Sequence, residues 1–291
     1  MNEAEFIWMN GEIVRWEDAR VHVLTHALHY GSGVFEGVRA YETERGTAVF
    51  RHQDHLARLH RSAELYYMDL PFTLEKLREA THDLIRRNKL KSCYIRPIAF
   101  RGYGEMGLFP LNTPVEVVIA VWPWGAYLGE EGQRRGIRAK VASWRRMSPD
   151  SFIPQAKACG QYLNSILAKV ESAKAGYDEA ILLDDHGHVS EGSGENVFVV
   201  RDGRISTPPA AASGQVRNSS ATLVSGPSAM RVNRSPWARA RDTSASAAGG
   251  EAGGPVRGGQ STASPSPSPP CSSAAVFTKG LRSGAAAPNA I

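Results

Sequence analysis

Residues 155–165 read Gln-Ala-Lys-Ala-Cys-Gly-Gln-Tyr-Leu-Asn-Ser, and residues 190–198 read Ser-Glu-Gly-Ser-Gly-Glu-Asn-Val-Phe. The first stretch places Lys157 among small residues, directly before a segment with helical periodicity. An amine that attacks a carbonyl group must be neutral for part of its cycle, and partial burial favours the neutral state. The second stretch places Glu191 at the end of a predicted strand and before the glycine-rich turn 192–194. These stretches therefore supply a candidate nucleophile and a candidate acid.

The segments around these two stretches alternate between strand and helix patterns. Residues 7–14 are predicted to form a hairpin, because Asn10-Gly11 separates two apolar runs. Thr73 can cap a helix that carries Leu74, Leu77, Ala80, Leu84 and Ile85 on one face. The other expected elements are helices over 52–67 and 161–175, strands over 93–100, 115–122 and 137–143, and hairpins turning at 185–187 and 202–203.

This alternation predicts a mixed α/β protein in two units. We expect an N-terminal α/β domain over 1–128, a connection over 129–136, and the start of a C-terminal domain over 137–209. From Pro208 onward 53 of the 84 residues are Ala, Ser, Gly or Pro. Because so few large apolar side chains cannot offset the chain entropy, we expect residues 210–291 to be an atypical, largely disordered tail.

Composition excludes several classes of protein. The net charge of the chain is +5. Residues 208–291 carry eight basic and two acidic side chains, so residues 1–207 have a net charge of −1. The tail is sparse in aromatic residues and its seven arginines are dispersed, which argues against nucleic-acid binding. No apolar run approaches the roughly 20 residues of a membrane span, and no secretory signal is recognisable. The three cysteines show neither disulfide nor metal-ligand spacing, so we expect a cytoplasmic protein without a metal.

The Lys157 and Glu191 stretches resemble the two signature segments of fold type IV pyridoxal-phosphate enzymes, in particular the branched-chain aminotransferases. The resemblance extends through residues 25–39, 58–63 and 94–97, and covers roughly residues 5–209. It implies a two-domain fold of the D-amino-acid aminotransferase type, with an incomplete C-terminal domain here. It also implies pyridoxal 5′-phosphate as the cofactor.

The resemblance gives roles to four residues at the cofactor. Lys157 is implied to form the Schiff base and to move the proton at the substrate α carbon. Glu191 is implied to hold the pyridine nitrogen, Tyr162 the phenolic oxygen, and Arg58 the phosphate. The residues alone leave other readings open, since Lys157 fits a loop lysine, Glu191 a turn-stabilising acid, and Arg58 a solvated helix residue.

The resemblance also places residues around the substrate, which must be a branched aliphatic amino acid or glutamate in turn. The implied wall is Tyr30, Phe35, Gly37, Arg39, Tyr94, Arg96 and Tyr127. Tyr30 is implied to reach in from a neighbouring subunit, so the expected partner is a second copy of the chain in a homodimer or higher oligomer. Taken singly, each of these aromatics also fits a plain core position.

After Pro209 the sequence departs from this family. A Leu-Pro-Gly-Ile-Thr-Arg segment and a later Ser-Gly-Thr-Ala segment, which would bind phosphate and substrate carboxylate, are both missing. The abrupt change in composition is typical of translation in a shifted reading frame.

The implied reaction is transamination between leucine, isoleucine or valine and 2-oxoglutarate, as in branched-chain amino acid biosynthesis. D-amino-acid aminotransferase and aminodeoxychorismate lyase share the fold and remain alternatives. So does an inactive, frame-shifted product. Residues 35–39, 94–96 and 124–127 favour the branched-chain type.

Overall fold

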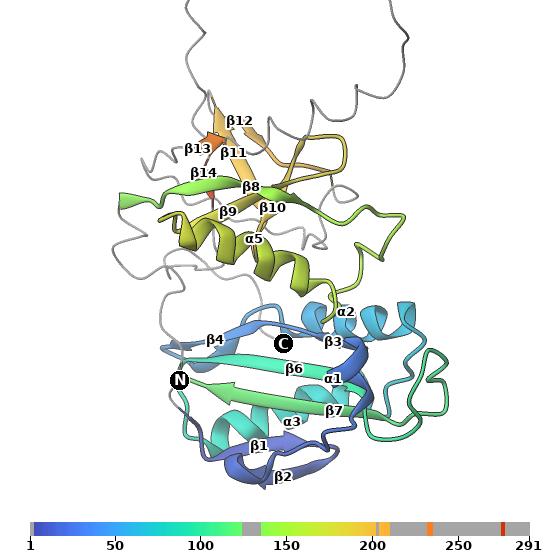
Figure 1. Cartoon of the computed structure of the whole chain (residues 1–291). Helices are drawn as coiled ribbons and strands as arrows, with labels where there is room; N and C mark the ends of the chain where they lie inside the picture. The colour runs from blue at the N-terminus through green and yellow to red at the C-terminus, as the bar shows by residue number, and fades with distance from the viewer. Residues whose placement is uncertain (1–2, 124–134, 202–203, 210–231, 235–274, 277–291) are drawn as a thin grey trace, which may run out of the picture.

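The computed structural model describes residues 3–123, 135–201, 204–209, 232–234 and 275–276. Within these ranges one sheet with three α-helices is built from residues 6–122, and smaller sheets with one helix follow from residue 139 (Figure 1). The expected mixed α/β fold is confirmed. The domain boundaries remain predictions, and the disorder expected for 210–291 falls almost wholly outside the described residues.

The N-terminal sheet has seven strands in the order β2-β1-β7-β6-β4-β5, with β3 paired to β6, and all pairings are antiparallel. The strands are β1 (Phe6–Met9), β2 (Glu12–Arg15), β3 (Gly33–Phe35), β4 (Val38–Thr43), β5 (Gly46–Val49), β6 (Cys93–Arg101) and β7 (Val115–Trp122). The predicted hairpin at residues 7–14 is confirmed, with positive φ at Asn10 (51°) and Gly11 (102°). Asn10 also receives a bond from the Val117 amide at 2.9 Å, which ties the hairpin to β7.

Helices α2 (His52–Leu65) and α3 (Leu74–Arg87) supply the other half of the N-terminal core, and short elements α1 (His26–Tyr30) and η1 (Trp16–Asp18) lie outside it. Leu56 and Leu59 of α2 and Leu77 and Leu84 of α3 are fully buried against the sheet. The Thr73 hydroxyl accepts a bond from the Lys76 amide at 3.2 Å, so the expected helix cap is present.

The second unit begins with β8 (Ala139–Arg145), which pairs in parallel with β9 (Glu179–Leu183). β10 (Val189–Gly192) runs antiparallel to β9, and β13 (Val232–Arg234) lies parallel to β8 on its other side. Helix α5 (Tyr162–Lys174) packs on this sheet through Ala168, which meets Ala142, Ala180 and Leu182. The remaining strands form a third sheet of β11 (Val197–Arg201), β12 (Arg204–Ser206) and β14 (Ala275–Val276).

Most predicted elements agree with the structure to within about two residues. The helix expected at 161–175 is α5, and the strand expected at 137–143 is β8, which begins two residues later. Sequence patterns missed α1, β3, β4 and β5, because these elements are short and carry no clear period. Within the described ranges, no helix is both long enough and apolar enough to cross a bilayer.

Replacing Thr73 tests the cap of α3. Thr73→Ala removes the hydroxyl that accepts the Lys76 amide, so the free energy of unfolding should fall by about 1 kcal/mol. Thr73→Ser keeps a hydroxyl and serves as the control. Urea denaturation of the three proteins measures the effect, and equal stability of Thr73→Ala and the parent would contradict this role.

Candidate active site

The Lys157 segment lies at the junction of the two units, where main-chain hydrogen bonds hold it. The Phe35 amide donates to the Lys157 carbonyl at 3.0 Å, and the Cys159 amide donates to the Gly33 carbonyl at 2.8 Å. On the other side, the Lys157 amide donates to the Ser62 hydroxyl of α2 at 3.1 Å. Residues 157–159 thus continue the pairing of β3, and the lysine side chain is fixed between the units.

The Lys157 amine lies in an aromatic environment. Nζ donates to the Tyr162 hydroxyl at 2.7 Å and lies 5.1 Å from the centre of the Phe35 ring. Burial lowers the pKa of Lys157, and Glu36 opposes that shift while Arg58 adds to it. A lysine held in this way has more neutral amine at neutral pH than a solvated one.

Tyr162 begins α5 and also touches Phe35, since their ring centroids are 4.9 Å apart. Burial raises the pKa of the Tyr162 hydroxyl, and the negative charge of Glu191 raises it further. The hydroxyl therefore stays protonated and can donate to an oxygen acceptor.

Glu191 lies on β10, is buried, and forms an ion pair with Arg146 at 2.6 Å from Nε to Oε1. Arg146 follows β8, is buried as well, and donates through Nη1 to the Asn164 amide oxygen of α5 at 3.2 Å. Sequence reasoning missed Arg146. A buried acid implies a nearby cation, but the sequence offers Arg138, Lys140, Arg145 and Arg146 without distinguishing them.

Arg58 lies in α2 and is buried, not solvated. Its guanidinium donates through Nε and Nη2 to the carboxylate of Glu36, the latter at 2.7 Å. His55 contacts the same carboxylate at 2.8 Å. Burial alone would raise the pKa of Glu36, but the hydrogen bonds from His55 and Arg58 outweigh it and hold the pKa well below its usual range. Sequence reasoning gave no role to Glu36.

Four of the predicted substrate residues gather beside Lys157, and they are Phe35, Gly37, Tyr94 and Arg96. The Arg96 guanidinium donates to the Tyr94 hydroxyl at 3.0 Å and stacks 4.6 Å from the centre of the Phe35 ring. A Cβ on Gly37 would come within 2.1 Å of the Tyr94 hydroxyl, so only glycine fits there with this position of Tyr94. Arg39 lies opposite Tyr94 in the β4–β6 register, and its guanidinium is 5.7 Å from the Tyr41 ring.

Two predicted residues are not brought to this group. Tyr30 is 44% exposed on α1, where its ring contacts His26 at 4.5 Å. Tyr127 lies outside the described residues.

The turn after Glu191 contains a second buried acid, Glu195. Its carbonyl accepts the Gly192 amide at 2.8 Å, and its carboxylate accepts the Gly194 amide at 3.1 Å. Burial, and next the charge of Glu179, raise the pKa of Glu195 to about 7. Glu195 therefore organises the turn, and its charge changes near neutral pH.

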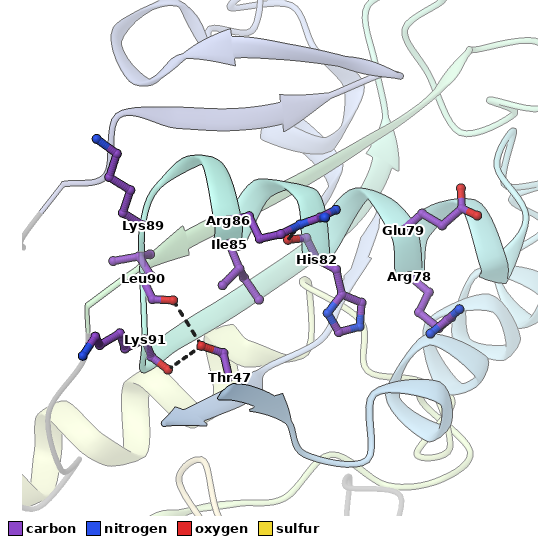
Figure 2. Close-up of a pocket in the computed structure, with 9 residues that line it drawn as sticks. All are labelled: Thr47, Arg78, Glu79, His82, Ile85, Arg86, Lys89, Leu90 and Lys91. Carbon is purple, nitrogen blue, oxygen red and sulfur yellow. Dashed lines mark hydrogen bonds between the residues drawn. The ribbon is translucent and has the colours of Figure 1, made fainter. Parts of the chain in front are cut away.

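Two further features lie apart from this group. A surface cavity of about 620 Å³ lies between α3 and β5, and Figure 2 shows the side chains that line it. It contains none of the predicted site residues. Of its four cations, Arg78, Arg86 and Lys91 already pair with Glu75, Asp83 and Glu42. Asp184, Asp185 and His186 place possible metal ligands within 4.8 Å of one another at a hairpin turn. Neither feature adds to the candidate site.

Comparison with known proteins gives consistent matches. The family model of amino-transferase class IV matches residues 33–219. The branched-chain-amino-acid aminotransferase of Escherichia coli strain K12 is 50% identical over 208 residues, which cover 71% of this chain and 67% of that protein. The Pseudomonas aeruginosa protein of the same name is 49% identical over 219 residues, covering 75% and 71%.

Solved structures match in the same way. The crystal structure of the E. coli branched-chain amino acid aminotransferase has a TM-score of 0.71 at 50% identity and covers 72% of this chain and 69% of that chain. The T.th. enzyme of the same name, complexed with N-(5′-phosphopyridoxyl)-L-glutamate, has a TM-score of 0.69 at 48% identity, covering 73% and 70%.

The Glu195 carboxyl should make stability depend on pH. Its pKa rises from 4.5 in a free glutamate to about 7 when folded, so the folded state binds the extra proton between these values. This contribution to stability is present below pH 4.5 and is lost as the pH rises through 7, by up to about 3 kcal/mol. Glu195→Gln should therefore gain stability relative to the parent over this range. Urea denaturation at several pH values gives the free energy of unfolding, with the exposed Glu64→Gln as control. A difference in this free energy between Glu195→Gln and the parent that does not change with pH would refute the role of Glu195.

Proposed function

This chain belongs to the class IV aminotransferase family, and from that premise we propose that it transfers amino groups between branched-chain L-amino acids and 2-oxoglutarate. The observation that carries the proposal is the Lys157 amine, which is partly buried against Tyr162 and Phe35 at the junction of the two units. The relatives matched at about 50% identity are named for branched-chain amino acids, which favours this substrate class over the D-amino-acid and aminodeoxychorismate alternatives.

Pyridoxal 5′-phosphate fits the chemistry of the residues present. Lys157 would bond its aldehyde carbon, Glu191 would hold the pyridine nitrogen, Tyr162 the phenolic oxygen and Arg58 the phosphate. The cofactor supplies an electron sink for charge on the substrate α carbon. Support for this assignment is that a partly buried amine, a buried acid and a buried guanidinium are all present in the same part of the fold.

The protein's own groups have distinct tasks. Lys157 would move a proton between the substrate α carbon and the cofactor. Its lowered pKa leaves part of the amine neutral, and the neutral amine can accept that proton. Arg146 pairs with the Glu191 carboxylate and holds it in place, so that Glu191 can bind a protonated ring nitrogen beside it. Tyr162 keeps its hydroxyl proton and can donate it to an oxygen next to the amine.

The substrate wall suits two kinds of side chain. Phe35 gives an apolar surface, and the missing side chain of Gly37 makes room for the Tyr94 hydroxyl, which a Cβ there would meet at 2.1 Å. Arg96, stacked on Phe35, places a cation at the edge of that surface, where it can bind the side-chain carboxylate of glutamate. A branched aliphatic group and a carboxylate can thus occupy the wall in turn.

We also propose that the chain works in the cytoplasm as a homodimer in which Tyr30 serves a neighbouring active site. Support comes from an exposed apolar surface on segments 21–30 and 103–111, which are joined by a contact between His26 Nε2 and the Gly107 carbonyl at 2.8 Å. Its members are Val21, Val23, Leu24, Leu28, Tyr30, Tyr103, Met106, Leu108, Phe109 and Leu111. Such clustered apolar exposure is typical of an interface.

Cofactor attachment tests the assignment of Lys157. The parent chain should bind pyridoxal phosphate, and borohydride reduction followed by peptide mapping should find the pyridoxyl group on Lys157. Lys157→Ala should abolish the adduct, whereas Lys174→Ala, which alters an exposed lysine at the end of α5, should keep it. A pyridoxyl group on another lysine would overturn the assignment, and a parent chain that binds no cofactor would support the inactive-product alternative.

Amine donors separate the related activities. L-Leucine should change the spectrum of the bound cofactor faster than D-alanine, because the wall carries an apolar surface and the relatives act on branched-chain amino acids by name. Faster reaction with D-alanine would favour the D-amino-acid alternative.

The exposed surface can be tested by its effect on assembly. Leu108 and Phe109 are 90% and 74% exposed, so the double change Leu108→Glu and Phe109→Glu should shift the protein from dimer to monomer in sedimentation velocity. Phe50→Glu, at an exposed position outside this surface, is the control. A parent that is already monomeric, or a double variant that remains dimeric, would contradict the proposed interface.

A further inference from the structure

Glu36 is anchored on the side of its strand segment that faces α2. It lies between Phe35 and Gly37, the two residues that border Lys157 and Tyr94, and its side chain is fully buried. Its amide donates to the Pro97 carbonyl at 2.8 Å, which fixes this segment on β6. Because alternate residues of an extended segment point to opposite faces, a buried Glu36 turns Phe35 and Gly37 towards the substrate side.

The Glu36 carboxylate is surrounded by hydrogen-bonding groups, most of them from α2. Arg58 donates through two nitrogen atoms, His55 contacts the same carboxylate at 2.8 Å, and the Gly37 amide donates at 3.2 Å. A guanidinium held by two parallel bonds has one fixed orientation. Removing one partner from such a buried pair leaves an uncompensated charge.

The same pocket collects several positive charges. Glu36, Arg58, Tyr94 and Arg96 all act electrostatically on Lys157. The Lys157 amine also donates a hydrogen bond to the Tyr162 hydroxyl. Among these groups Glu36 is the carboxylate, and Arg58 and Arg96 are the cations.

We propose that Glu36 is a positioning residue of the active site: it orients Arg58 towards the phosphate of the cofactor and balances the charge of Arg58 and Lys157. This inference rests on the proposed function in taking Lys157 as the cofactor-bonding amine and Arg58 as the phosphate ligand. If Glu36 had only a structural role, its replacement would loosen the packing and admit water to the pocket. It would not make the electrostatic field at Lys157 more positive.

Competitive acylation of the chain without cofactor separates the two roles. Labelling with acetic anhydride across pH, followed by mass spectrometry of the Lys157 peptide, gives the pKa of that lysine. In Glu36→Gln the neighbouring negative charge is lost, so the pKa of Lys157 should fall and its labelling at neutral pH should rise roughly three- to tenfold. If Glu36 only packs the segment, water entry should raise the pKa towards that of an ordinary lysine, and an unchanged or raised pKa overturns the proposal. Glu64→Gln, an exposed change on α2, the helix that carries Arg58, should leave the labelling of Lys157 unchanged.

A second variant guards against loss of folding in Glu36→Gln. Glu36→Asp keeps the charge but shortens the side chain, so the pKa of Lys157 should stay close to that of the parent. A fall as large as that in Glu36→Gln would contradict the role of charge balance.

Cofactor affinity tests the orientation of Arg58. Glu36→Gln and Glu36→Asp should both weaken binding of pyridoxal phosphate about tenfold or more, while changing the affinity for pyridoxal, which lacks the phosphate, much less. Equal losses for both compounds would overturn this part of the proposal. A parent chain that binds neither compound would refute the proposed function instead, and the acylation result would still decide the role of Glu36 in charge balance.

Discussion

The main-chain pairing between residues 33–35 and 157–159 is the contact on which the site depends. Two amide-to-carbonyl bonds, Phe35 to Lys157 and Cys159 to Gly33, extend the N-terminal sheet by one short segment of the second unit. Gly31 and Gly160 allow this approach, since a Cβ on Gly31 would come within 2.9 Å of the Gly160 Cα. The lysine from one unit is thereby placed against Phe35, Tyr94 and Arg96 from the other, and neither unit alone contains the whole group.

Two buried ion pairs belong to this part of the fold, Arg58 with Glu36 and Arg146 with Glu191. Buried pairs of this kind contribute little net stability, because desolvation offsets most of the attraction. Their value here is orientation and charge. One pair fixes a guanidinium from α2, and the other fixes an acid on β10, so each of these groups is held in place by a charged partner.

Local sequence patterns predicted the parts of the fold that depend on local chemistry. Asn10-Gly11 gave the first hairpin, Thr73 gave the start of α3, and the small residues around Lys157 marked the candidate nucleophile. The short elements α1 and β3 escaped prediction because they are held by contacts with distant residues. Glu36 and Arg146 were missed for the same reason: a buried charge is recognised by its partner, and pairs that are 22 or 45 residues apart in the chain cannot be read from a local pattern.

Hydrogen exchange of the chain without cofactor tests the central claim most directly. The amides of Phe35 and Cys159 form main-chain hydrogen bonds that join the two units, so peptides covering 33–36 and 157–160 should exchange together and almost as slowly as β6. Rapid exchange of the 157–160 peptide, at the rate of an exposed loop, would contradict it, because Lys157 would then not be held at the junction by its backbone.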